Sequence, residues 1–220
     1  MGFLHDDKSA TGLMNRVFNL ISLNVIWIVC CIPIITIGAA TTAMYDVLLR
    51  LCFGEDVSVV HTFFKKFVFH LKKATVLFLI AAAVAIFLAF DFWCSLFCAD
   101  GVRLVVQIVL LCIGFFAAAV GCFLFPTLAY FNENIRTTIK HAFVLSMKNG
   151  VFTVFIMLIS FLPFLLILLI PGFYFNTSLI WITIGFALLA QVNAMYFARI
   201  FDQNRLDKLQ HQRNDDDCAR

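Results

Sequence analysis

Residues 104–132 read LVVQIVLLCIGFFAAAVGCFLFPTLAYFN, a run of 29 positions without a single charged side chain. A helix needs about 20 consecutive apolar residues to cross the hydrocarbon core of a bilayer. The whole chain agrees with this stretch, because 63% of its 220 residues are hydrophobic and only 13% are charged. Soluble domains have roughly half apolar and a quarter charged residues, so a soluble globular fold, a disordered chain and a nucleic-acid-binding protein are excluded. The sequence therefore predicts an all-α, polytopic helical membrane protein.

Runs with few or no charges predict about five transmembrane helices. The longest run, 149–198, has 50 residues. It is interrupted at 171–178 by proline, glycine and Asn/Ser/Thr residues, which are typical of a turn. The spans are expected at about 17–37, 74–95, 104–126, 150–170 and 179–199. They form a single transmembrane domain over 17–199, which lies between an N-terminal tail at 1–16 and a polar cytoplasmic tail at 200–220.

The first run, 17–45, is longer than one crossing requires and shorter than two crossings. Pro33 lies near its middle, where proline removes a backbone hydrogen bond and kinks or ends a helix. Gly38 follows, and glycine can adopt backbone angles closed to other residues. We favour a single kinked helix that ends near the membrane surface. A broken or re-entrant segment that lines a cavity is the alternative, because irregular backbone in a membrane must be buried in protein or wetted.

The positions of lysine and arginine predict the orientation of the spans, because cytoplasmic loops carry an excess of both. With five spans, 13 of the 16 Lys and Arg residues fall on one side. The C-terminus lies on that side and is therefore expected in the cytoplasm. The N-terminus is expected outside if the first run crosses once. If that run re-enters, the short tail moves inside and 15 of the 16 share one side.

Two basic amphipathic helices are predicted on the cytoplasmic side, at 57–73 and 134–149. In the first, apolar residues recur at steps of three and four, and lysines occupy the other side, as in helices that lie in the membrane interface. Together with the apolar stretch 39–51, it is expected to form a cytoplasmic ledge. We expect its lysines to anchor it at lipid headgroups, and its aromatic residues to dock a partner or lipid. These candidates are Lys65 and Lys66 for the anchor, and Phe63, Phe64 and Phe67 for docking.

Polar side chains inside the predicted spans are further candidates, because each is costly in hydrocarbon unless it faces protein or water. They are Asn24, Gln107, Gln191 and Asn193. The favoured role is helix packing through interhelical hydrogen bonds, which are usually worth about 1 kcal/mol or less each. A polar pathway for a solute is the alternative.

Sequence patterns that signal catalysis, a cofactor or a metal are missing. The eight cysteines lack the spacing of a zinc site, and no H-E-x-x-H, G-x-S-x-G or Walker loop occurs. We expect the cysteines to act as small apolar residues. No catalytic, cofactor-binding or metal-binding residue is expected, so the protein is not expected to be an enzyme.

Three stretches carry a family resemblance: NVIW at 24–27, PIITIGAATTAMY at 33–45 and FFKKF at 63–67. Together they resemble the YesL family of bacterial integral membrane proteins, over about residues 19–74. That family is a domain of unknown function. Its genes commonly lie beside components of sugar ABC importers and beside polysaccharide-degrading enzymes, which implies a multi-pass protein of the bacterial plasma membrane with a link to carbohydrate uptake.

The resemblance and the absence of catalytic motifs together give the functional expectation. The leading hypothesis is a non-catalytic accessory or scaffold protein for oligosaccharide uptake, with permease subunits of a sugar ABC importer and the lipid bilayer as partners. A small-solute transporter or channel is the alternative. It is motivated by the break between Pro33 and Gly38, although the spans carry no buried pair of opposite charges that we could identify for ion coupling.

Overall fold

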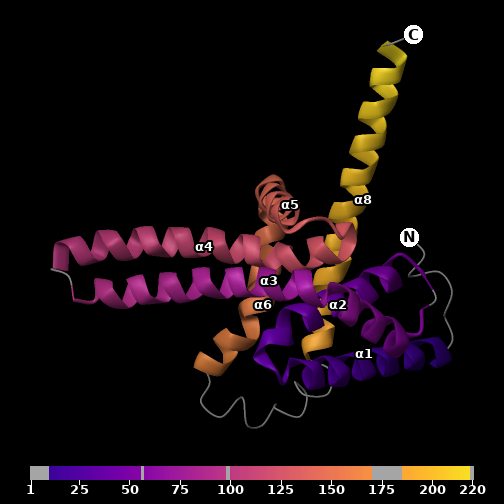
Figure 1. Ribbon diagram of the computed structural model, residues 1–220, viewed down its shortest axis with the longest axis horizontal. Coiled ribbons are helices and arrows are strands. Elements are labelled where there is room, and N and C mark those ends of the chain that lie inside the picture. The colour runs from indigo at the N-terminus through magenta and orange to yellow at the C-terminus, as the bar shows by residue number, and fades with distance from the viewer. Residues whose placement is uncertain (1–9, 56, 98–99, 170–184, 219–220) are drawn as a thin grey trace.

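Helices make up nearly all of the described chain. The computed structural model describes residues 10–55, 57–97, 100–169 and 185–218, and no strand occurs within these ranges. The helices are α1 (Ala10–Cys31), the 3-10 helix η2 (Ile34–Thr36), α2 (Ile37–Cys52), α3 (Val59–Ser95), α4 (Asp100–Phe131), α5 (Ile135–Lys148), α6 (Gly150–Leu169) and α8 (Phe186–Cys218) (Figure 1).

Several of these helices are long and apolar enough to cross a membrane. Within the described residues they are Ile34–Cys52, Val59–Ser95 and Gly101–Phe131, with a fourth if α5 and α6 together form one broken span. The expectation of an all-α membrane protein is therefore confirmed. The turn expected at 171–178 and the first part of the span expected at 179–199 lie outside the described residues.

The first uncharged run forms two helices rather than one kinked helix. α1 ends at Cys31, Pro33 precedes η2, and α2 begins at Ile37. Trp27 Nε1 lies 3.4 Å from Thr41 Oγ1, although the two residues are 14 positions apart. A continuous helix would separate them by about 21 Å, so the chain reverses at the break. The hydroxyl of Thr36 supports the reversal, because it lies 2.7 Å from the carbonyl oxygens of Cys30 and Pro33.

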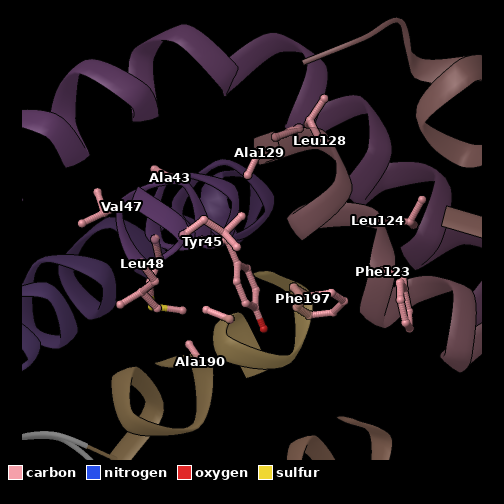
Figure 2. Close-up of a cluster of buried hydrophobic side chains, with 14 of the residues drawn as sticks. Ala43, Tyr45, Val47, Leu48, Phe123, Leu124, Leu128, Ala129, Ala190 and Phe197 are labelled. Carbon is pink, nitrogen blue, oxygen red and sulfur yellow. The ribbon is translucent and has the colours of Figure 1, made fainter. Parts of the chain in front are cut away.

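α2 lies at the centre of the fold and packs against α1, α3, α4 and α8. Almost every side chain from Gly38 to Leu49 is buried. Figure 2 shows its residues facing α4 and α8, with the ring of Phe197 on α8 between Tyr45 and Phe123. The stretch 39–49 is therefore part of the core, and the expectation that it forms an exposed ledge is wrong. Its small residues allow close helix packing, as is common in membrane proteins.

Gly38 makes the closest approach between α2 and α3. A Cβ atom at this position would lie 2.7 Å from the carbonyl oxygen of Ala74 and 2.7 Å from Cβ of Phe78. Gly38 lies inside α2, and it is Gly54, in the turn after α2, that has a positive φ of 80°. The sequence analysis singled out Gly38 for its backbone freedom, but the structure shows that it is needed for its missing side chain.

α3 and α4 form a long hairpin that projects from the remaining helices (Figure 1). α3 has 37 residues and is about 55 Å long, whereas the hydrocarbon core is about 30 Å thick. The basic segment 57–73 is therefore continuous with the expected span 74–95 and is not a separate helix. α4 also continues past its expected end at Pro126 and reaches Phe131.

The C-terminal half contains a sharp bend and another long helix. The axes of Ile135–Lys148 and Gly150–Phe161 meet at 104°, so α5 runs nearly perpendicular to α6. α8 continues as a helix from Phe186 to Cys218, beyond the expected end of the last span at 199. In Figure 1 the C-terminal half of α8 extends away from the other helices.

Candidate functional site

The most unusual polar feature of the fold is a buried carboxylate. Asp46 lies near the C-terminal end of α2, and only 4% of its surface is exposed. Burial of an unpaired charge is very costly. Three side chains supply the compensation: Arg50 Nε lies 2.6 Å from Asp46 Oδ1, while Lys66 Nζ and His70 Nε2 lie 3.0 Å and 3.4 Å from Oδ2. We refer to Asp46, Arg50, Lys66 and His70 as the Asp46 cluster.

Helix geometry explains why these side chains meet. Arg50 follows Asp46 by four positions on α2, and His70 follows Lys66 by four positions on α3, so each pair lies on one helix face. α2 and α3 pack against each other, which brings the two faces together. The buried side of α3 carries Phe63, His70, Ala74 and Leu77 at helical spacing.

The charges of the Asp46 cluster are balanced once the neighbouring Glu55 is included. The carboxylates of Asp46 and Glu55 face the cations of Arg50 and Lys66, since Arg50 Nη1 also lies 2.8 Å from Glu55 Oε2. His70 is only 1% exposed, and its Nδ1 has no hydrogen-bond partner among the described residues. A neutral His70 can donate a hydrogen bond from Nε2 to Asp46 and keep an acceptor lone pair on Nδ1.

Chemically, the cluster is best suited to holding two helices together. It combines one carboxylate that is nearly inaccessible with partners on both α2 and α3. Removing one member of such a pair leaves a buried charge uncompensated, which typically costs about 3–5 kcal/mol.

A second charged contact ties α3 to the end of α4. Lys73 Nζ lies 3.2 Å from the backbone oxygen of Asn132 and 3.3 Å from its Oδ1. Asn132 follows the last residue of α4 and has a φ of 48°. A cation at the C-terminus of a helix is favourable, because the last carbonyl groups carry partial negative charge. Lys73 therefore serves as a helix cap from a neighbouring helix.

The lysines expected to anchor the basic helix thus have different roles. Lys66 and Lys73 make contacts inside the protein, whereas Lys65 and Lys72 are exposed. The same division applies to the aromatic residues. Phe63 is completely buried, Phe67 is half-buried and Phe64 is 48% exposed. The five candidates do not form one docking surface, because Phe63 and Lys66 face the core and only Phe64 and Lys65 face outward.

Three of the four intramembrane polar candidates make contacts between helices. Asn24 Oδ1 on α1 accepts a hydrogen bond of 2.9 Å from the backbone N–H of Ala187, in the first turn of α8. This hydrogen bond joins the middle of α1 to the first turn of α8. Asn193 Nδ2 lies 3.1 Å from Ser160 Oγ on α6, and Gln191 Nε2 lies 3.6 Å from Cys52 Sγ.

Gln107 differs from the other three intramembrane candidates. It is half-buried on α4 and makes no hydrogen bond with another described side chain. Pro33 is exposed at the reversal between α1 and α2, so it marks the break as expected. Among the described residues, no group of three His, Cys, Asp or Glu side chains could hold a metal ion.

Asp46 was not among the predicted site residues, because the first uncharged run ends at Tyr45, the preceding residue. Two features of the sequence indicate the Asp46 cluster. Asp46 and Arg50 have the i,i+4 spacing of a helical ion pair in an otherwise apolar segment, and Lys66 and His70 have the same spacing in the next helix. Their meeting depends on how α2 and α3 pack, which the sequence pattern alone did not reveal.

Comparison with known protein families finds a match for part of the chain. Residues 20–92 match a protein family described as "Protein of unknown function, DUF624". This segment runs from the middle of α1 to near the end of α3 and includes the whole Asp46 cluster. No curated protein and no solved structure matches the chain. From α1 to α3, the chain is therefore similar to a protein family of unknown function.

Proposed function

We propose that the protein is a non-catalytic membrane scaffold that serves carbohydrate uptake, in association with the permease subunits of a sugar ABC importer. The proposal places it in the bacterial plasma membrane with its C-terminus in the cytoplasm, as the distribution of lysine and arginine predicts. It also assigns the chain to the YesL family. The link to sugar import comes from that resemblance.

The observation that supports a scaffold best is the contrast between the helices packed around α2 and the projecting α3–α4 hairpin. Around α2, Lys66 of α3 pairs with Asp46 of α2, and Lys73 of α3 contacts Asn132 at the end of α4. The outer half of the hairpin instead exposes large apolar side chains on both helices. They include Ile86, Phe87, Phe90 and Trp93 on α3, and Leu104, Val105, Ile108 and Leu111 on α4.

Such a hairpin is suited to contact with lipid on one side and with another membrane protein on the other. Association of helices inside a membrane depends on packing rather than on hydrophobicity. A preformed pair of long helices offers a rigid surface for such packing, and the ion-paired base of α3 holds it in a fixed orientation. We therefore place the permease contact on one face of the hairpin.

Co-purification of the full chain with identified importer permeases tests this function. Two matched double variants change exposed apolar residues on opposite helices: Ile86→Ala with Phe90→Ala on α3, and Val105→Ala with Val109→Ala on α4. Wild-type protein should recover the permeases, and one of the two variants should lose them while both remain folded. Recovery that neither variant weakens would contradict the hairpin as the contact surface. Failure of the wild type to recover any importer permease would contradict the scaffold function.

A small-solute transporter or channel is the second candidate, and the reversal between α1 and α2 favours it. Helices interrupted inside a membrane line substrate sites in many transporters. Here the interruption at residues 32–36 lies next to the core, with Trp27 and Thr41 in contact across it. Solute uptake by the purified protein in liposomes would support this candidate. Importer recovery without uptake would support the scaffold.

A further inference from the structure

α5 presents an outward face with an unusual combination of side chains. Its inner face packs on α4 through four buried residues: Thr138, Ala142, Leu145 and Ser146. The opposite face carries both large apolar and basic residues. Phe143, Val144 and Met147 are 52%, 54% and 46% exposed, and the exposed Arg136 and Lys140 lie among them at helical spacing.

The bend after α5 determines how this face is oriented relative to the membrane plane. α5 meets the first part of α6 at 104°, and α6 is an apolar helix of 20 residues, about the thickness of the hydrocarbon core. If α6 crosses the bilayer, α5 lies close to the membrane plane. The exposed apolar residues also continue along the chain from Met147 into Val151, Val154 and Phe155 of α6.

The charge of α5 determines which surface it fits. The helix contains arginine, lysine and histidine but no acidic residue. The acid just before it, Glu133, lies 3.1 Å from Nδ1 of His141 and forms no ion pair with Arg136 or Lys140. Basic side chains near the membrane surface attract anionic lipid headgroups, and apolar side chains of the same helix insert between the lipids.

We infer that the outer face of α5 binds anionic phospholipid, with Arg136 and Lys140 at the headgroup phosphates and with Phe143, Val144 and Met147 among the acyl chains. This inference goes beyond the scaffold function, because it assigns a lipid preference to a helix outside the proposed permease contact. According to the predicted orientation, the connection between α4 and α6 lies on the cytoplasmic side. The lipid contact of α5 is therefore placed in the cytoplasmic leaflet.

Quenching by brominated lipids tests this inference with the full-length protein. The Phe143→Trp variant is reconstituted into vesicles of phosphatidylcholine and phosphatidylglycerol, in which only one of the two lipids is brominated at a time. Overall composition stays constant, so the ratio of quenching by the two lipids reports local enrichment. Wild-type protein under the same conditions supplies the signal of the native tryptophans, which is subtracted. Brominated phosphatidylglycerol should quench several-fold more than brominated phosphatidylcholine.

Charge variants decide whether α5 itself selects the lipid. Arg136→Gln with Lys140→Gln should lower the preference for phosphatidylglycerol, by up to about fivefold for each cation removed. Lys65→Gln with Lys72→Gln removes the same charge from exposed positions on α3 and should leave the ratio unchanged. An equal effect of both pairs, or equal quenching by the two lipids, would overturn the inference. Absence of quenching by either lipid would also overturn it, because this face of α5 would then not contact the bilayer.

Discussion

Lys66 Nζ on α3 lies 3.0 Å from Asp46 Oδ2 on α2, and this pair joins the buried core helix to the base of the projecting hairpin. Asp46 is the single acidic residue of α2. Two helices that pack mainly through small and aliphatic side chains could slide along each other. A buried polar pair specifies the register, as buried polar residues do in other helical assemblies.

Replacement of Asp46 by asparagine should destabilise the protein strongly. The change removes the only carboxylate that compensates Lys66 within the described contacts, and it leaves Arg50 with Glu55 alone. Because Lys66 and Arg50 retain some solvent access, we expect a loss of about 2–3 kcal/mol, below the upper range for fully buried pairs. The free energy of unfolding in mixed detergent micelles measures this loss.

Asp91→Asn is the matched control for that measurement. Asp91 is half-buried near the far end of α3, and the substitution changes the same charge outside the Asp46 cluster. It should alter stability by about 0.5 kcal/mol or less. Equal effects of the two substitutions would show that net charge, rather than the cluster, determines the stability.

Adjacent lysines on α3 should respond differently to the same substitution. Lys66→Gln removes a cation next to Asp46 and should cost about 1–3 kcal/mol, because a buried carboxylate loses a partner. Lys65→Gln changes an exposed side chain and should cost about 0.5 kcal/mol or less. The unfolding midpoints of the two variants give the comparison directly. A larger loss at Lys65 would mean that the lysine-bearing face of α3 is oriented differently.

Gly38→Ala should weaken the contact between α2 and α3. The added Cβ would lie 2.7 Å from a backbone oxygen and from a neighbouring Cβ, and overpacking typically costs about 1–3 kcal/mol. Alanine gains up to about 1 kcal/mol over glycine as a helix former, so the clash should dominate. Gly114→Ala in α4 meets nothing within 4 Å and should be neutral or stabilising. Thermal unfolding of both variants checks the opposite signs.

Asn24→Ala should loosen the start of α8. The substitution removes the acceptor for the backbone N–H of Ala187, and an unsatisfied buried amide costs about 1–3 kcal/mol. Hydrogen–deuterium exchange should become faster in the first turn of α8. Asn19→Ala, at a half-buried position earlier on α1, should leave this exchange unchanged. Unaltered exchange in the Asn24 variant would refute a role of this hydrogen bond in holding the start of α8.

The sequence predicted the helical membrane class and the approximate positions of most helices, because long apolar runs are a strong signal. The continuity of α3 was also visible, since residues 59–95 contain neither proline nor glycine. The basic segment 57–73 and the apolar segment 74–95 differ in composition, but nothing in the sequence breaks the backbone helix between them. Pro126 misled the prediction in the other direction. Proline predicts the end of a helix, but α4 continues past it to Phe131.

The core position of α2 could not be predicted in the same way. A segment of small and aliphatic residues is compatible with a surface ledge, a span or a buried helix, and the neighbours of the segment decide among them. The polar candidates show the same limit. Asn24, Gln191 and Asn193 were recognised as polar residues in apolar helices, but their partners on other helices are set by tertiary packing.

A double-mutant cycle on Asp46 and Lys66 tests most directly whether the Asp46 cluster holds α2 to α3. The free energy of unfolding is measured for wild type, Asp46→Asn, Lys66→Gln and the double variant. If the two side chains stabilise each other, the double variant should lose less stability than the two single losses combined, with a coupling of about 1–3 kcal/mol. Additive losses, with a coupling near zero, would contradict the account, because the contact between α2 and α3 would then not depend on this pair.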